Sequence, residues 1–317
     1  MEYKFLDRQS FQKYMKEFGE LYTLCFGVPM DEQEVKWRYL ENPRKEILAC
    51  IALDGDRLVA NYSASPIQLI RNGEIVKVAQ SLNTMTHPDY IGKGLFVKLA
   101  QTVYSYMAKN GYKMVMGFPN NISNRTFLSK LNWRDICVVP TLEINLETVR
   151  KKNLNLEVTV CEDSKFDLDY SKCIQQDKKI ISVYKPKEYL KWRYAQCPSV
   201  EYYNFVILSE MGYVSSRIIL KEFRNRINIV DAYFKNVDEE KALLNYSIDF
   251  GRSRGKSLLT MWAKLGSQEH LAIESYGAIL ASPISYFGGC VFDSSDIYGD
   301  FYEADNWFLN MSDDNVY

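Results

Sequence analysis

Two glycines, separated by one residue, form the part of this chain whose residue types and spacing point most directly to chemistry. Gly92 and Gly94 lie in the segment HPDYIGKGLFVKLAQ, between a strand-like run and a helix-like run. Glycines let the backbone approach a ligand closely, and the N–H groups at a helix start carry partial positive charge. The arrangement predicts a site for an anion such as a phosphate group. It lacks the third glycine of a dinucleotide fingerprint and the Gly-Lys-Ser/Thr of a Walker loop.

Acid–base candidates are few. His87 directly precedes the glycine segment, and the ordinary pKa of a histidine, about 6.5, suits a general base. Asp313 and Asp314 form a carboxylate pair near the end of the chain, and Asp314 is the second candidate base. A base that acts through water would leave no signature in the sequence. The chain has 2 histidines and 7 cysteines with no C-x-x-C pair, so no metal site is expected.

The elements that must position the glycines lie on both sides of them. Residues 46–53, 57–70 and 75–86 have the composition of three strands, and Asp54-Gly55 and Asn72-Gly73 predict the turns between them. After the glycines, the apolar residues fall at helical spacing on one face, namely Phe96, Leu99, Ala100, Val103 and Met107. Asn110-Gly111 predicts the end of this helix. A buried strand over 112–118, expected to be parallel, and a helix over 120–133 follow.

A repeat indicates that this arrangement occurs twice. KWRYLENP at 36–43 returns as KWRYAQCP at 191–198, and three strand-like runs joined by two tight turns follow each copy. The tryptophans and tyrosines of the repeat are expected to anchor short helices on a core. The second copy has no Gly-x-Gly segment. We therefore predict two domains, 1–150 with the anion site and 151–317 without it.

The composition is that of an ordinary globular protein. The chain has 317 residues, of which 47% are hydrophobic and 25% charged, and its net charge is −1. This balance gives no general attraction to nucleic acid or to anionic membranes. No apolar run is long enough to span a bilayer, and the first residues lack a signal-peptide core. The scattered cysteines indicate reduced thiols, so we expect a cytoplasmic protein.

The segment TMTHPDYIGKG, together with the residues as far as KLNW at 130–133, resembles the GNAT (GCN5-related) N-acetyltransferase family over about 50 residues. The acetyl-CoA loop of that family is Arg/Gln-x-x-Gly-x-Gly/Ala, and Gly92 and Gly94 match its glycines. Asp89 stands at the Arg/Gln position. Asn121 matches the asparagine that opens the next helix in the family. Leu128 stands where the family often has the tyrosine that protonates the leaving thiolate.

The resemblance implies which residues hold acetyl-CoA. Main-chain N–H groups of the loop and the first helical turn would bind the pyrophosphate, and backbone groups of the preceding strand would hold the pantetheine arm and the thioester oxygen. The loop residues are Ile91, Gly92, Lys93, Gly94, Leu95 and Phe96, and the strand residues are Asn83, Thr84 and Met85. Asn121, at the start of the next helix, completes the set of residues expected to bind the cofactor. A histidine followed by proline before the loop is common in the family as a structural element, which is the alternative role for His87.

The resemblance also implies an α/β fold of the α+β type. It would contain two GNAT-like domains, each a mixed, mostly antiparallel twisted sheet flanked by helices, with the degenerate second copy shaping the acceptor cleft. The expected function is transfer of an acyl group from acetyl-CoA to a small-molecule amine, such as an amino-sugar or its nucleotide, by direct attack on the thioester. Two alternatives remain open: a Fem-type aminoacyl or peptidyl transferase, and a non-catalytic CoA-binding protein. The protein is expected to be a monomer or a homodimer.

Overall fold

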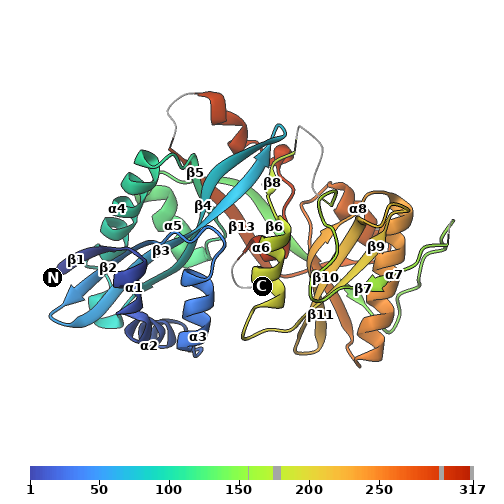
Figure 1. Cartoon of the computed structure of the whole chain (residues 1–317), viewed down its shortest axis with the longest axis horizontal. Helices are drawn as coiled ribbons and strands as arrows, with labels where there is room; N and C mark the ends of the chain where they lie inside the picture. Colours follow the sequence, from blue (N-terminus) through green and yellow to red (C-terminus); the bar gives the residue numbers. More distant parts are fainter. Residues whose placement is uncertain (156, 174–179, 293–295, 315–317) are drawn as a thin grey trace. The chain divides into compact units, whose positions relative to one another are not determined.

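The chain forms two compact units in the computed structural model, which describes residues 1–155, 157–173, 180–292 and 296–314 (Figure 1). Unit 1 comprises Met1–Cys137 and Tyr286–Trp307. Unit 2 comprises Val138–Ser285 and Phe308–Tyr317. These units differ from the predicted division at residue 150, because a segment near the C-terminus completes the sheet of unit 1.

Unit 1 opens with one strand and three helices. They are β1 (Glu2–Leu6), α1 (Arg8–Gln12), α2 (Met15–Phe26) and α3 (Glu32–Val35), and α3 continues into the π-helical turn η1 (Lys36–Leu40). The first copy of the repeat lies in η1. Trp37 and Tyr39 are each only 4% exposed, so the prediction that they anchor a short helix is confirmed.

Three antiparallel strands follow, and β1 pairs with the first of them. They are β2 (Leu48–Asp54), β3 (Arg57–Arg71) and β4 (Glu74–Thr86). Asn72 and Gly73 have φ angles of 54° and 79°, and positive angles at both positions are what a type I′ hairpin requires. Both predicted hairpins are therefore confirmed.

The connection from β4 leads through the predicted glycine segment into a helix and a parallel strand. The elements are η2 (Pro88–Tyr90), α4 (Leu95–Lys109), β5 (Met114–Gly117), α5 (Asn121–Lys130) and β6 (Arg134–Asn145). Strand β5 pairs with β4 in parallel, through Ala79–Val115 and Gln80–Met116. Strand β4 continues past this pairing to Thr86. The edge of β4 from Ser81 onward is therefore where a ligand could lie beside the strand.

Alternating side chains of the sheet build two apolar layers in unit 1. Leu48 and Cys50 of β2 pack in a cluster with the buried face of α4, whereas Ala49 and Ile51 pack in a second cluster with α1, α2 and η1. The helical face predicted for α4 is confirmed, since Leu99, Ala100, Val103 and Met107 are fully buried. Figure 1 shows α4 and α5 on the opposite side of the strands from α1, α2 and α3.

Unit 2 contains the same order of elements. A short helix and π-helical turn, α6 (Lys187–Leu190) and η3 (Lys191–Ala195), precede the antiparallel strands β9 (Tyr202–Leu208), β10 (Val214–Phe223) and β11 (Arg226–Tyr233). Then come α7 (Val237–Ser253), the parallel strand β12 (Leu258–Trp262) and α8 (Gln268–Glu274). Three short elements lie outside this order, namely β7 (Cys161–Glu162), β8 (Ser182–Val183) and the turn η6 (Met311–Asp313). Strand β7 pairs with β9.

The last strand of each sheet comes from the other half of the chain. Strand β13 (Ile279–Val291) follows α8, yet its end pairs antiparallel with β5, from Gly288–Gly117 to Val291–Met114. The end of β6 pairs antiparallel with β12, from Thr141–Trp262 to Asn145–Leu258. A Cβ at Gly289 would lie 2.5 Å from the Val115 carbonyl oxygen, so this close pairing requires a glycine. After β13, unit 1 ends with the turns η4 (Asp296–Tyr302) and η5 (Ala304–Asn306).

The predicted fold class is confirmed, since a mixed, mostly antiparallel sheet is flanked by helices. Among the described residues, no helix combines the length and apolarity that crossing a bilayer would need. Nor do three or more His, Cys, Asp or Glu side chains of the described ranges gather in a way that could hold a metal ion.

A buried glutamate in α7 should make stability depend on pH. Glu240 is 7% exposed, and burial, with a smaller effect of Glu269, raises its pKa to about 7. Because the folded pKa is raised above the unfolded value of about 4.3, its contribution to stability is full below that value and is lost as pH rises to about 7.

Glu240→Gln is therefore expected to increase the free energy of unfolding at pH 8 by about 1–3 kcal/mol relative to wild type. The difference should shrink toward zero near pH 4.5. Urea denaturation at the two pH values measures it, with the exposed Glu274→Gln as control. An equal effect of Glu240→Gln at both pH values would contradict the raised pKa.

Candidate functional site

The predicted anion site lies at the start of α4. Gly92 and Gly94 have φ angles of 83° and 73°, in the left-handed region that favours glycine, and a Cβ at either position would meet no atom within 4 Å. Gly94 is the N-cap of the 15-residue helix α4, and no side chain caps it. The N–H groups of the first turn, from Leu95 onward, therefore have no partner within the helix. The loop is exposed, so these groups can bind an anion from solvent.

Two lysines beside this helix start are held against aromatic rings. Lys93 Nζ lies 4.1 Å from the centre of the Tyr90 ring, and Lys98 Nζ lies 3.7 Å from the centre of the Tyr3 ring. Both lysines are exposed, so the rings restrict the ammonium groups without removing them from solvent. A bound phosphate would gain their charge in addition to the main-chain N–H groups.

The predicted strand residues lie at a bulge of β4. Asn83 has a φ angle of 34°, and the β3–β4 register shifts here, because Asn61 pairs with Met85 but Ser63 with Leu82. The Asn61 side chain donates to the Asn83 carbonyl at 2.9 Å. Thr84 is half-buried. Met85 is 1% exposed in the core, so only its backbone could contact a ligand.

The hydroxyl of Tyr39, the tyrosine of the repeat, supports the bulge. The sequence did not reveal this contact. The Asn83 side chain donates to the Tyr39 hydroxyl at 2.9 Å, and that hydroxyl lies 2.9 Å from Ser63 Oγ. Burial is the main cause that raises the pKa of Tyr39 to about 12, so the hydroxyl stays protonated. The sequence signal was the recurrence of Trp-Arg-Tyr, but it carried no information about the hydroxyl's partners.

His87 has contacts at both ring nitrogens. The Asp89 backbone N–H lies 3.2 Å from Nδ1, and an Arg57 guanidinium nitrogen lies 2.6 Å from Nε2. His87 is 7% exposed. The two contacts hold the ring between the loop residue Asp89 and Arg57. These contacts are those of a structural residue, and the catalytic role of His87 stays a prediction.

His87→Asn is therefore expected to lower the free energy of unfolding by about 1–2 kcal/mol, because buried hydrogen bonds are lost. The pH profile of kcat/KM should keep its shape. His270→Asn, which removes the other histidine of the chain, is the matched control. Loss of the acidic limb of the profile in His87→Asn alone would identify His87 as the base and contradict the structural assignment.

Helix α5 differs from the prediction at its start. Asn120, and not Asn121, is the N-cap, since its side chain accepts from the N–H groups of Ile122 and Ser123. Asn121 is the first helical residue and is exposed. The asparagine that satisfies the helix start is therefore one residue earlier than predicted. Leu128, at the position of the family's tyrosine, is 37% exposed.

The carboxylate pair belongs to unit 2, whereas the glycine loop belongs to unit 1. Asp314 is half-buried, and its carbonyl oxygen accepts from Arg193 at 3.4 Å. Asp313, the other acid of the pair, is buried, at 3% exposed. An ion pair of 2.6 Å with Lys185 explains its burial.

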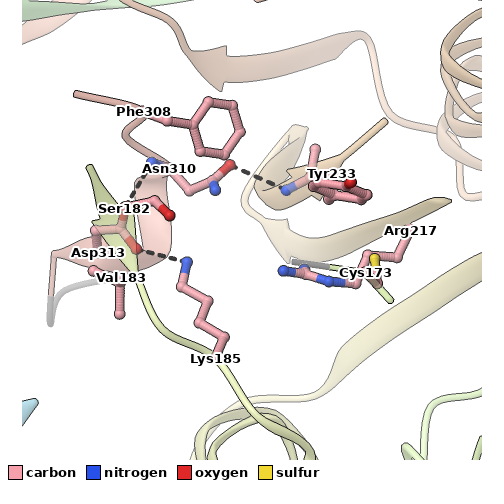
Figure 2. Close-up of a pocket in the computed structure, with 10 residues that line it drawn as sticks. Cys173, Ser182, Val183, Lys185, Arg217, Tyr233, Phe308, Asn310 and Asp313 are labelled. Carbon is pink, nitrogen blue, oxygen red and sulfur yellow. Dashed lines mark hydrogen bonds and ion pairs between the residues drawn. The ribbon is translucent and has the colours of Figure 1, made fainter. Parts of the chain in front are cut away.

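Asp313 is part of a buried polar cluster of unit 2, which we call the Asp231 cluster. Its charged members are Lys185, Arg217, Asp231 and Asp313, and Figure 2 shows three of them around a cavity of about 30 Å³. Lys185 Nζ lies 2.6 Å from Asp231 Oδ2, and Arg217 pairs with the other Asp231 oxygen. The Tyr194 hydroxyl donates to Asp231 at 2.7 Å. The second copy of the repeat thus also presents its tyrosine to the third strand of its unit.

The two carboxyls of the Asp231 cluster differ in pKa. Burial would raise the pKa of Asp231, but Arg217 and Lys185 together hold it well below the ordinary value. At Asp313, burial outweighs Lys185 and raises the pKa. Lys185 therefore pairs with two carboxylates, of which Asp231 also pairs with Arg217.

The C-terminal segment of unit 2 lies along the end of β11. Pairing of β11 with β12 extends from Arg226 to Ile229, and β11 continues to Tyr233. Beyond the pairing, the Ala232 N–H donates to Asn310 Oδ1 at 3.1 Å, and η6 contacts β11. In unit 1, the edge of the third strand, β4, extends past the parallel strand β5. In unit 2, the C-terminal segment covers the corresponding edge of β11.

Comparison with known proteins gives a family for part of the chain. Residues 8–136 match the family model described as an acetyltransferase (GNAT) domain. No curated protein matches the chain.

Solved structures agree with this fold over most of the chain. A probable N-acyltransferase from Enterococcus faecalis has a TM-score of 0.71 at 13% identity, covering 92% of this chain and 73% of its own. A GCN5-related N-acetyltransferase from Anabaena variabilis has a TM-score of 0.69 at 14% identity, with coverages of 92% and 73%. A GCN5-related N-acetyltransferase from Kribbella flavida has a TM-score of 0.71 at 13% identity, with coverages of 92% and 71%. Residues 8–136 are thus similar to GNAT acetyltransferase domains, and the rest of the chain shares the fold of these solved structures.

Proposed function

We propose that the protein transfers an acetyl group from acetyl-CoA to the amine of a small molecule, with an amino-sugar or its nucleotide as the favoured acceptor class. The observation that carries this proposal is the uncapped start of α4 behind Gly92 and Gly94, next to a strand that extends past its parallel neighbour. The first feature suits a pyrophosphate and the second suits an extended arm that hydrogen-bonds along a strand edge.

The reaction would be direct attack of a neutral amine on the thioester carbonyl. The C–N bond forms, the C–S bond breaks with its electron pair going to sulfur, and the amine proton passes to solvent or to a base. The residues of unit 1 would bind the cosubstrate through the loop of Ile91–Phe96 and through backbone groups at Asn83–Met85. In the transition state, negative charge develops on the thioester oxygen and on the departing sulfur. A hydrogen-bond donor at either atom therefore lowers the barrier.

Unit 2 is proposed to be a degenerate copy that binds no acyl-CoA. Its element order supports the duplication, and so does a likeness to solved structures over 92% of the chain. The C-terminal segment supports the degeneracy, because Asn310 already occupies the Ala232 N–H. Each of the seven cysteines is a free thiol, which supports a reducing location such as the cytoplasm.

Calorimetric titration of the full chain with acetyl-CoA tests the proposal, with CoA, longer acyl-CoAs and NAD as comparators. We expect one acetyl-CoA per chain. A screen of amino-sugars, their nucleotides and other amines for thiol release would then identify the acceptor. Absence of binding to every CoA species would overturn the proposal, and two molecules per chain would overturn the degenerate second copy.

One observation favours a second candidate, a CoA-binding protein without catalysis. Leu128 cannot supply the proton that the family's tyrosine supplies. Acetyl transfer to any amine eliminates this candidate. Binding of acetyl-CoA without thiol release across the amine screen would favour it, and turnover only with aminoacyl-tRNA would favour the Fem-type alternative.

A further inference from the structure

A chain of hydrogen bonds in unit 1 leads from the core to the strand edge proposed for the thioester. The Trp133 indole nitrogen lies 2.7 Å from the Tyr104 hydroxyl, which lies 3.2 Å from the Tyr62 hydroxyl. The Tyr62 hydroxyl lies 3.0 Å from Ser81 Oγ. Trp133, Tyr104 and Tyr62 are 4%, 8% and 0% exposed, whereas Ser81 is half-buried.

The direction of this chain follows from counting donors. An indole N–H can only donate, so Tyr104 oxygen must accept from Trp133. Each hydroxyl has one hydrogen. The geometry makes the Tyr62 hydroxyl the donor both to Tyr104 and to Ser81, and its single hydrogen serves one of them at a time. When Tyr62 donates to Ser81, the Ser81 hydrogen is left at the outer end of the chain.

Ser81 stands where β4 leaves β5. It follows Gln80, the last β4 residue that pairs with β5, and precedes the bulge at Asn83. A Cβ at Gly117 would lie 3.5 Å from Ser81 Cβ and 3.3 Å from the Trp133 ring. The bare backbone of Gly117 therefore lets Ser81 and the Trp133 ring pack closely against the end of β5. Phe96, from the proposed cosubstrate loop, stacks on Tyr62 with ring centres 6.1 Å apart, so the chain of hydrogen bonds and the loop adjoin.

We propose that the Ser81 hydroxyl donates a hydrogen bond to the CoA sulfur as the C–S bond breaks, and so replaces the tyrosine that is absent at Leu128. This inference rests on the proposed function. Ser81 would be the catalytic residue, and Tyr62, Tyr104 and Trp133 would be positioning residues. A hydroxyl that itself accepts a hydrogen bond is a stronger donor, because bonds in such a chain polarise one another.

The step balances without a proton leaving the chain of hydroxyls. Sulfur keeps the electron pair of the C–S bond and departs as a thiolate that accepts the hydrogen bond of Ser81. The proton that the amine loses goes to solvent. Burial raises the pKa of Tyr62 and of Tyr104, so neither becomes a phenolate, and both remain donors throughout.

The test uses a readout other than turnover, the ionisation of CoA thiol bound to the full-length protein, followed by thiolate absorbance during a pH titration. We expect the bound thiol of the wild type to ionise about tenfold more readily than free CoA thiol, the size of one hydrogen bond to a charged group. Ser81→Ala should return it to the free value. In acetyl transfer, Ser81→Ala should lower kcat by about 10–100-fold and change the acetyl-CoA Kd by less than about threefold.

Two further variants and one control keep the test decisive. Tyr62→Phe and Trp133→Phe should each give a partial loss, because they weaken the Ser81 donor without removing it. Ser105→Ala on the exposed face of α4, whose hydroxyl bonds only within its helix, should behave as wild type.

Equal thiol ionisation in the wild type and Ser81→Ala would overturn the inference while leaving the proposed function intact. If Ser81→Ala does not fold, Tyr62→Phe takes its place in the test. Equal thiol ionisation in Tyr62→Phe and the wild type would then overturn the inference in the same way. Absence of CoA binding by the wild type, seen by calorimetry, would overturn both.

Discussion

Gly92→Glu and Gly94→Glu are each expected to weaken acetyl-CoA binding at least 100-fold in a protein that still folds. Both residues have positive φ angles, where a side chain costs about 1–2 kcal/mol. A carboxylate at the proposed pyrophosphate site would add repulsion of several kcal/mol at close range. Since about 1.4 kcal/mol is a tenfold change in affinity, a repulsion of about 3 kcal/mol or more is enough for the 100-fold loss.

The expected folding of these variants has a structural reason and a matched control. A Cβ at either glycine meets no atom within 4 Å, and the same is true at Gly73 in the turn between β3 and β4, with a φ angle of 79°. Gly73→Glu therefore carries the same backbone strain without facing the loop, and it should bind acetyl-CoA as the wild type does. Calorimetry measures the affinities, and circular dichroism checks folding. A folded Gly92→Glu or Gly94→Glu variant with wild-type affinity would rule out the assigned loop.

Asp231→Asn is expected to lower the free energy of unfolding of unit 2 by about 3–5 kcal/mol, the cost of leaving buried charges without their partner. Asp231 is 0% exposed and contacts both Lys185 and Arg217. Because these cations hold its folded pKa below the unfolded value, its contribution to stability is present at neutral pH. It should be lost as pH falls below about 4, where the unfolded carboxyl also takes up a proton.

Asp313→Asn separates this effect from the simple loss of a buried acid. Asp313 shares Lys185 with Asp231, but burial raises its pKa, so the charged form contributes less. We expect Asp313→Asn to lower the free energy of unfolding by about 1 kcal/mol or less. Loss of the exposed ion pair of Asp249 with Lys151 should lower it by no more than that. Urea denaturation at pH 7, with Asp249→Asn as control, measures all three. Equal costs for Asp231→Asn and Asp313→Asn would contradict the assignment.

The sequence could predict some features of this protein and not others. The hairpin turns, the amphipathic face of α4 and the glycine loop follow from local chemistry. Asn-Gly adopts positive φ angles readily, apolar residues at helical spacing need one buried side, and a Gly-x-Gly before a helix start exposes N–H groups. Such signals lie within a few residues of one another, so a sequence pattern contains them completely.

Residues that meet only across the sheet were not predictable in this way. The Tyr39 hydroxyl and the Asn83 side chain are distant in sequence, and their contact depends on the bulge in β4. The same holds for the order of donors from Trp133 to Ser81. The correction at α5, where Asn120 caps the helix in place of Asn121, is smaller, since either asparagine could accept from the first turn.

The sequence by itself determined the Gly-x-Gly turn before α4, the repeated helix–strand order and the apolar faces, because each depends on neighbours within one element or one turn. Only the tertiary structure decided which strand completes each sheet, that Asp313 is buried against Lys185, and that a hydroxyl chain ends at Ser81. Those outcomes depend on distant segments competing for the same hydrogen bonds and the same desolvated space, and the free energy of that competition is not contained in any local pattern.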